Sequence, residues 1–140
     1  MIREIILDTE TTGLDPFQGD KIIEIAAIEL IDHISTDKKF HCYINPERDI
    51  PETSKQIHNI SYEMVKDKPI FKDIIDNFLS FIKNDTIIIH NADFDLKFLN
   101  YELSLCGFNS LQNNIIDTLS IARSKYPGKS VSLDSLCKRF

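Results

Sequence analysis

The sequence has no tryptophan, only four glycines and five prolines, and no apolar run long enough to suggest a membrane anchor. So little glycine and proline argues against a long linker or a low-complexity tail. The N-terminal MIREIILDTET carries charged residues early and has no extended apolar stretch, so we expect neither a signal peptide nor a membrane span. These absences predict a compact, cytoplasmic protein.

Cysteine is also scarce. The three residues, Cys42, Cys106 and Cys137, are far apart and show no C-x-x-C spacing. An odd number of scattered cysteines predicts buried thiols in a reducing compartment and argues against a disulfide framework or a zinc site.

A basic stripe is missing as well. The net charge is −6 and the pI is about 5.1, which argues against a protein that binds nucleic acid through its own positive charge alone. Bound divalent cations can meet phosphates in place of lysine and arginine. Composition therefore disfavours a passive DNA binder more than a metal-dependent nuclease.

What the sequence does contain is a regular alternation of apolar segments over 140 residues, a length that suits one domain. Their periodicity predicts, in order, strands at 4–8, 21–31 and 39–44, a short helix near 61–66, a helix at 69–84, a strand at 86–90, a helix at 94–107, a strand at 114–117, and helices at 118–125 and 132–139. This order predicts an α/β fold whose mixed central sheet, an antiparallel meander followed by parallel strands, is flanked by helices.

Two carboxylates end the first predicted strand, in the segment IILDTETTG. Residues two apart in a strand point to one face, so Asp8 and Glu10 aim at the same volume. Oxygen ligands placed in this way suit a hard divalent cation. The following Thr11–Gly13 could let a phosphate or sugar approach the backbone closely. A solvated turn at a strand end explains the same short pattern and stays open.

A second acidic cluster follows the strand TIIIH, in HNADFDLKFL. Asp95 is expected in the first turn of the next helix, facing the strand end, because Phe94, Phe98 and Leu99 occupy its core side. Asp93 is better placed to cap that helix or to meet solvent. Asp95 could equally be an acid that complements the helix dipole.

The segments IILDTETTGL, KIIEIAAIEL, QIHNIS, IIIHNADFD and IIDTLSIARSKYPGKSVSLDSLCKRF resemble, in this order, the DEDD-type 3′–5′ exonucleases. Within that family the likeness is closest to the proofreading epsilon subunits of bacterial DNA polymerase III. The resemblance implies an RNase H-like fold. It also implies removal of nucleotides from 3′ ends with two metal ions, Mg²⁺ or Mn²⁺.

The same resemblance assigns roles to individual residues. It makes Asp8, Glu10 and Asp95 catalytic and metal-binding, and it places Asp8, Glu10, Thr11, Thr53 and His58 at the substrate. Read alone, His58 could equally be a histidine of a surface loop. Asp117 matches a recurrent acid of the family, but its position between a strand and a helix favours a helix cap.

One part of the family pattern is missing. The fourth acid and the general base come from an H-x-x-x-x-D motif on a later helix, which the 140 residues do not include. His90 and Asp95 have this spacing, but His90 ends an apolar strand, where we expect it to be hydrogen-bonded in place. We therefore expect a single exonuclease domain over 1–140, cut before its last helix, with weak metal binding and little activity.

The leading hypothesis is a proofreading exonuclease that acts on a DNA 3′ end, with the catalytic (alpha) subunit of DNA polymerase III as its partner. Two alternatives stay open: an RNA-trimming exonuclease of the same superfamily, and a non-catalytic module that binds a polymerase or a nucleic acid. A phosphatase with an aspartyl nucleophile is disfavoured, because its second acid is normally aspartate and this chain has Glu10.

Overall fold

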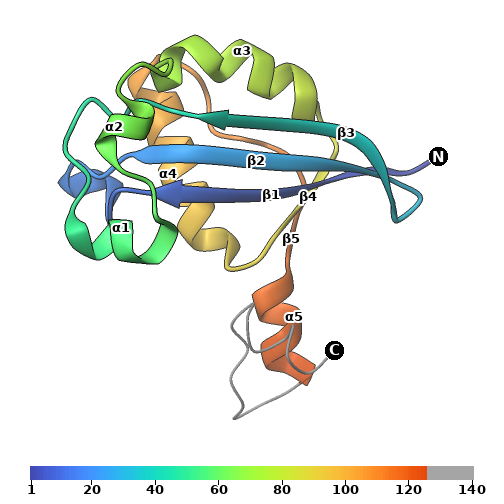
Figure 1. The fold of residues 1–140 in the computed structure, drawn as a ribbon. Coiled ribbons are helices and arrows are strands. Elements are labelled where there is room, and N and C mark those ends of the chain that lie inside the picture. Colours follow the sequence, from blue (N-terminus) through green and yellow to red (C-terminus); the bar gives the residue numbers. More distant parts are fainter. Residues whose placement is uncertain (126–140) are drawn as a thin grey trace.

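The computed structural model describes residues 1–125, which form a five-stranded sheet with helices around it (Figure 1). The strands are β1 (Arg3–Thr11), β2 (Ile22–Ile31), β3 (Ile34–Tyr43), β4 (Thr86–Ile89) and β5 (Ile115–Asp117). Their order across the sheet is β3-β2-β1-β4-β5. The first three strands pair antiparallel, and β4 and β5 continue parallel to β1. The predicted mixed sheet is therefore confirmed.

The helical elements are η1 (Pro16–Gln18), α1 (Glu52–His58), α2 (Tyr62–Val65), α3 (Phe71–Ile82), α4 (Ala92–Leu105) and α5 (Thr118–Lys125). In Figure 1, α1 lies beside the end of β1, the strand that carries the first acidic pair of the sequence. No helix within residues 1–125 is long and apolar enough to cross a membrane.

The main core lies between one face of the sheet and the helices α3 and α4. The strands contribute alternate residues and the helices contribute residues at helical spacing; among them are Ile5, Leu7, Ile25, Ala27, Ile87, Ile89, Ile75, Phe78, Ile82, Phe98, Leu99 and Leu103. Because side chains alternate along a strand, burial of Ile5 and Leu7 turns Asp8 and Glu10 to the opposite face. The hydrophobic pattern thus fixes where the acids of β1 point.

The strand β3 begins at Ile34, five residues before its predicted start. Its first residues are mostly exposed, so the apolar signal there is weak. A two-residue turn, Asp32–His33, makes the early pairing possible. Both residues have positive φ, 50° and 69°, which is the backbone that a tight hairpin requires and that glycine or asparagine normally provides.

Other differences are local. Helix α1 lies between the predicted strand at 39–44 and the predicted helix near 61–66, where the sequence predicts no element, because it is short and only Ser54 of its residues is buried, so it has no apolar periodicity. Cys42 and Cys106 are free thiols, as expected, but they are half-buried rather than buried. Burial raises the pKa of Cys42 to about 11. The predicted helix at 132–139 and Cys137 lie outside the described residues.

A buried acid of α4 holds the start of β2. The register between β1 and β2 shifts after Glu10, so that Thr11 lies opposite Ile22. At this irregularity the N–H of Ile22 donates to Glu102 Oε2 at 2.9 Å, and the side chain of Glu102 is only 5% exposed. Burial raises the pKa of Glu102 to about 7. Glu102, on helix α4, thereby fixes the start of β2, the strand that pairs with the acidic end of β1.

We expect Glu102→Gln to stabilise the fold at alkaline pH. The pKa of Glu102 is about 7 in the folded state and 4.5 ordinarily. Between these pH values the folded state keeps a proton that the unfolded chain has lost, so the wild type loses stability across that interval as pH rises. At about 1.4 kcal/mol for each pH unit, the variant gains up to about 3 kcal/mol near pH 8 and almost nothing near pH 4. Urea unfolding of both proteins across this range measures the difference, and a gain that does not change with pH would contradict the prediction.

Candidate active site

Asp8 and Glu10 lie on the same face of β1, near its C-terminal end. The side chain of Asp8 reaches solvent and that of Glu10 is half-buried. Desolvation raises the pKa of Asp8, and it raises that of Glu10 to about 7, with further contributions from the charges of Asp8 and Glu24. Two acids that resist joint ionisation form a place where a cation would be stabilised.

Glu24 is an acid of this face that the sequence analysis did not single out. It lies directly opposite Glu10 in the β1–β2 register, and its Oε2 contacts Nε2 of His41 at 2.6 Å. Its charge adds to the negative potential at both Asp8 and Glu10. The cross-strand register was the signal that could have found it, because the pattern of β2 alone shows only a half-buried strand.

Asp95 lies in the first turn of α4, as predicted, and is 4% exposed. The hydroxyl of Thr9 donates to its Oδ1 at 2.5 Å, which joins the helix to the strand that carries the acidic pair. Desolvation raises the pKa of Asp95 to about 7, and the charges of Asp8 and Glu10 act in the same direction. The three predicted acids therefore repel one another across the junction of β1 and α4.

Of the two acids near Asp95, Asp93 is exposed to solvent and Asp117 holds helix termini. Asp93 is exposed and makes no capping hydrogen bond, so its predicted role as a cap is wrong and the alternative of a solvent-facing side chain holds. The start of α4 is instead held by Asp117, which accepts from the N–H groups of Asn91 and Ala92. Asp117 also accepts from the N–H of Leu119 at 2.9 Å, which confirms the predicted cap of α5.

His90 is hydrogen-bonded in place, as expected. Its Nδ1 contacts the hydroxyl of Thr118 at 2.9 Å. Within the described residues its buried Nε2 has no hydrogen-bond partner.

A cleft of about 440 Å³ opens beside the acids. One wall is the end of β1 and the loop after it, from Glu10 to Leu14, and the other is the segment from Pro51 to His58 that includes α1. Thr11, Thr53 and His58, all predicted substrate residues, line it together with Glu10. Asp8 and Asp95 are not part of its lining; the charge of Asp8 raises the pKa of Glu10, and the charge of Glu10 contributes to the raised pKa of Asp95.

His58 has both ring nitrogens engaged by the backbone. Nδ1 accepts from the N–H of Ile60 at 3.0 Å, so the proton of the neutral ring is on Nε2, which contacts the carbonyl of Thr11 at 3.2 Å. Desolvation lowers the pKa of His58, which favours the neutral ring. In this arrangement His58 shapes the cleft and holds Thr11 in place.

The chemistry of this donor set suits a hard cation more than covalent catalysis. Carboxylate oxygens of Asp8, Glu10 and Asp95 are ligands of the type that Mg²⁺ and Mn²⁺ accept. Within residues 1–125, however, no three Asp, Glu, His or Cys side chains are already arranged to hold an ion. The hydrogen bond from Thr9 turns one oxygen of Asp95 toward β1.

Comparison with known proteins identifies relatives of the whole chain. A family model for exonucleases, RNase_T, matches residues 5–140. The DNA polymerase III subunit epsilon of Rickettsia typhi is 59% identical over 143 residues, covering 99% of this chain and 62% of the relative. The subunit of the same name from Salmonella typhimurium is 41% identical over 146 residues, covering 99% and 60%. The chain thus spans about three-fifths of the length of these curated relatives.

Solved structures show the same architecture. Exonuclease X in complex with 5′ overhanging duplex DNA superposes with a TM-score of 0.77 at 29% identity, covering 97% of this chain and 72% of that chain. E. coli Exonuclease I in complex with a dA16 oligonucleotide gives a TM-score of 0.79 at 17% identity, covering 90% and 30%. The second likeness concerns the fold alone. Together with the mixed sheet, these structures confirm the predicted RNase H-like fold.

Proposed function

Because the chain belongs to the exonuclease family whose model matches residues 5–140, we propose that it removes nucleotides one at a time from the 3′ end of DNA. Its relatives in Rickettsia and Salmonella carry the name DNA polymerase III subunit epsilon, which supports proofreading during replication as the biological role. Exonuclease X was solved with DNA, which favours DNA over RNA as the substrate.

The observation that carries the proposal is the placement of Glu10. It lines the cleft. Burial and the charge of Asp8 raise the pKa of Glu10. Burial and the charges of Asp8 and Glu10 raise the pKa of Asp95. A cleft that is lined by Glu10, whose charge interacts with Asp8 and Asp95, suits a phosphodiester only if cations accompany it, because carboxylates alone repel phosphate.

We propose that Asp8, Glu10 and Asp95 hold two divalent ions, Mg²⁺ or Mn²⁺. Exonucleases of this family generally depend on divalent metals. When bound, such a pair supplies an activated water and neutralises charge on the departing 3′ oxygen. Burial raises the pKa of all three carboxyl groups, and the charge of Asp8 adds to this at Glu10 and Asp95, which supports this assignment.

The remaining cleft residues would bind and orient the terminal nucleotide. Leu14 and Ile57 stand at opposite walls and are 76% and 79% exposed, so they offer apolar surface to a base or sugar. Thr11 and Thr53 add polar groups between them. His58, whose nitrogens are taken by the backbone, would act on the nucleotide by shape rather than by charge.

The relatives are named as subunits of DNA polymerase III, which supports another polymerase subunit as the partner of this chain. We propose that the chain works beside the catalytic (alpha) subunit of a DNA polymerase III, which would deliver a frayed primer end to the cleft. Co-purification of the two subunits from a strain that expresses both would test this part separately from the chemistry.

The direction of degradation tests the proposed function. With the protein in excess and Mn²⁺ present, single-stranded DNA labelled at its 5′ end should yield a ladder of progressively shorter labelled products. The same strand labelled on its 3′-terminal nucleotide should release labelled mononucleotide at once.

A strand whose last linkage is a phosphorothioate serves as the matched control, because it should resist the first cut while remaining the same length and charge. Labelled fragments cut from the interior, or release from the 5′ end, would overturn the proposal. An RNA strand of the same sequence compares the two substrate classes.

A further inference from the structure

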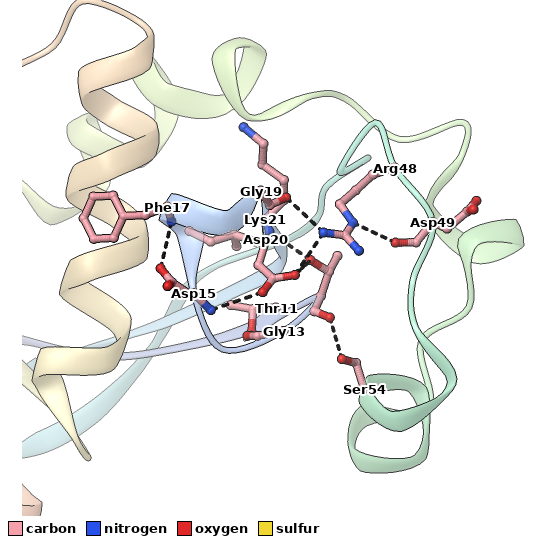
Figure 2. Close-up of polar contacts among 12 residues, drawn as sticks. Thr11, Gly13, Asp15, Phe17, Gly19, Asp20, Lys21, Arg48, Asp49 and Ser54 are labelled. Carbon is pink, nitrogen blue, oxygen red and sulfur yellow. Dashed lines mark hydrogen bonds and ion pairs between the residues drawn. The ribbon is translucent and has the colours of Figure 1, made fainter.

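The tripeptide Thr11–Gly13 forms one wall of the cleft, and Asp20 holds it from behind (Figure 2). Asp20 lies on the loop just before β2. Its Oδ1 accepts from the hydroxyl of Thr12 at 3.1 Å and from Nη1 of Arg48 at 3.0 Å. Its Oδ2 accepts from the N–H of Asp15 at 3.1 Å. Although Asp20 borders the cleft, protein groups engage both of its oxygens.

The carboxylate of Asp20 leaves no room for a side chain at Gly13. A Cβ atom at position 13 would lie 2.3–2.5 Å from the carboxylate atoms of Asp20, far inside contact distance. The backbone of Gly13 is not in the left-handed region, so its conformation alone would accept alanine. The loop and the carboxylate therefore fit together at this point.

Arg48 connects the same carboxylate to the segment that leads into the opposite wall. Its Nη1 also donates to the carbonyl of Gly19 at 3.1 Å, and its Nε donates to the carbonyl of Asp49 at 2.9 Å. A few residues on, the hydroxyl of Ser54 donates to the carbonyl of Thr12 at 2.5 Å. Figure 2 shows Arg48, before α1, bonded to Gly19 and Asp20, and Ser54, in α1, bonded to the loop after β1.

We propose that Asp20 and Arg48 are positioning residues for the 3′-terminal nucleotide. They fix the distance between the two walls of the cleft and hold the Thr11–Gly13 backbone against the substrate. This inference rests on the proposed function, since it names the residues that set nucleotide affinity at that site.

The acids themselves are placed by other contacts. Asp8 and Glu10 are held by pairing of β1 with β2, and Asp95 is held by Thr9. Loss of the Asp20–Arg48 pair should therefore weaken substrate binding and leave the chemical step nearly intact. A purely structural role would raise the half-saturating protein concentration only as far as the folded fraction falls, so the folded fraction of each variant is measured by circular dichroism and the constant is corrected for it.

The test is a single-turnover measurement on the whole chain, with a short single-stranded DNA and Mn²⁺ at increasing protein concentration. We expect Asp20→Ala to raise the half-saturating concentration roughly tenfold, through loss of charge-assisted hydrogen bonds to a loop at the substrate. The maximal rate should stay within about twofold of the wild type. Arg48→Gln, at a more exposed position, should shift the same constant in the same direction.

Asp49→Asn is the matched control. It removes one negative charge beside the same arginine but keeps the carbonyl that Arg48 uses. It should leave both the half-saturating concentration and the maximal rate unchanged.

Gly13→Ala supplies a test of the contact itself. In the wild type the new methyl group must displace Asp20 and should weaken binding. In the Asp20→Ala background the same substitution should add little, because the clashing carboxylate is gone.

The outcomes separate the two proposals. If Asp8→Asn leaves shortening intact, the proposed function fails whatever Asp20 does. If Asp8→Asn stops shortening but Asp20→Ala and Arg48→Gln leave half-saturation unchanged, or lower only the maximal rate, the positioning role is wrong. Equal effects of Gly13→Ala in both backgrounds would also overturn it.

Discussion

Asp8→Asn should stop the Mn²⁺-dependent shortening of DNA, with a fall in the single-turnover rate of about 1,000-fold or more. Asp8 interacts with both other acids, because the charge of its carboxylate raises the pKa of Glu10 and that of Asp95. An amide keeps the volume of the side chain but removes the charge that a divalent ion needs. Several kcal/mol of transition-state stabilisation depend on such an ion, and each 1.4 kcal/mol is a factor of ten.

The fold should survive this change, because Asp8 reaches solvent and belongs to the face of β1 away from the α3–α4 core. Asp93→Asn is its matched control. It removes one exposed carboxylate two residues from Asp95 and breaks no capping hydrogen bond, so the shortening rate should not change. A Asp8→Asn protein that is folded by circular dichroism and still shortens DNA at the wild-type rate would contradict the assignment of Asp8.

Local periodicity accounts for what the sequence could predict of this site. Alternation of Ile5 and Leu7 with the residues between them put Asp8 and Glu10 on one face. The helical spacing of Phe98 and Leu99 put Asp95 in the first turn of α4, beside the sheet. Both inferences need only the repeat of a strand or a helix, and such repeats are visible in any short window of sequence.

The parts that sequence could not show depend on contacts between distant segments. Thr9 meets Asp95 across 86 positions of sequence, and Arg48 meets Asp20 across 28. Helix α1, which supplies Ser54 and His58, has no apolar repeat because it lines one wall of the cleft and buries only Ser54. The predicted role of His58 at the substrate stays a prediction, and only the three-dimensional arrangement shows its nitrogens bonded to backbone.

Asp95→Asn should make the metal-free protein more stable and less responsive to metal. The pKa of Asp95 is raised from 3.8 to about 7, so the wild type loses folding free energy as pH rises between these values. Asparagine keeps an oxygen for the hydroxyl of Thr9 and carries no charge to repel Asp8 and Glu10. Near pH 8 we expect a gain of about 1–3 kcal/mol in the free energy of unfolding, and near pH 4 almost none.

Added Mn²⁺ should reverse that order. An ion that binds only the folded state raises the melting temperature of the wild type, by an amount that grows with the logarithm of its affinity, and Asp95→Asn should lose most of that increase. Glu102→Gln is the matched control, because Glu102 is equally buried with a pKa of about 7 but contacts Ile22 instead of the acids. It should gain stability at high pH and keep the full response to Mn²⁺. If both variants respond to Mn²⁺ like the wild type, Asp95 is a structural acid of the helix terminus and not a metal ligand.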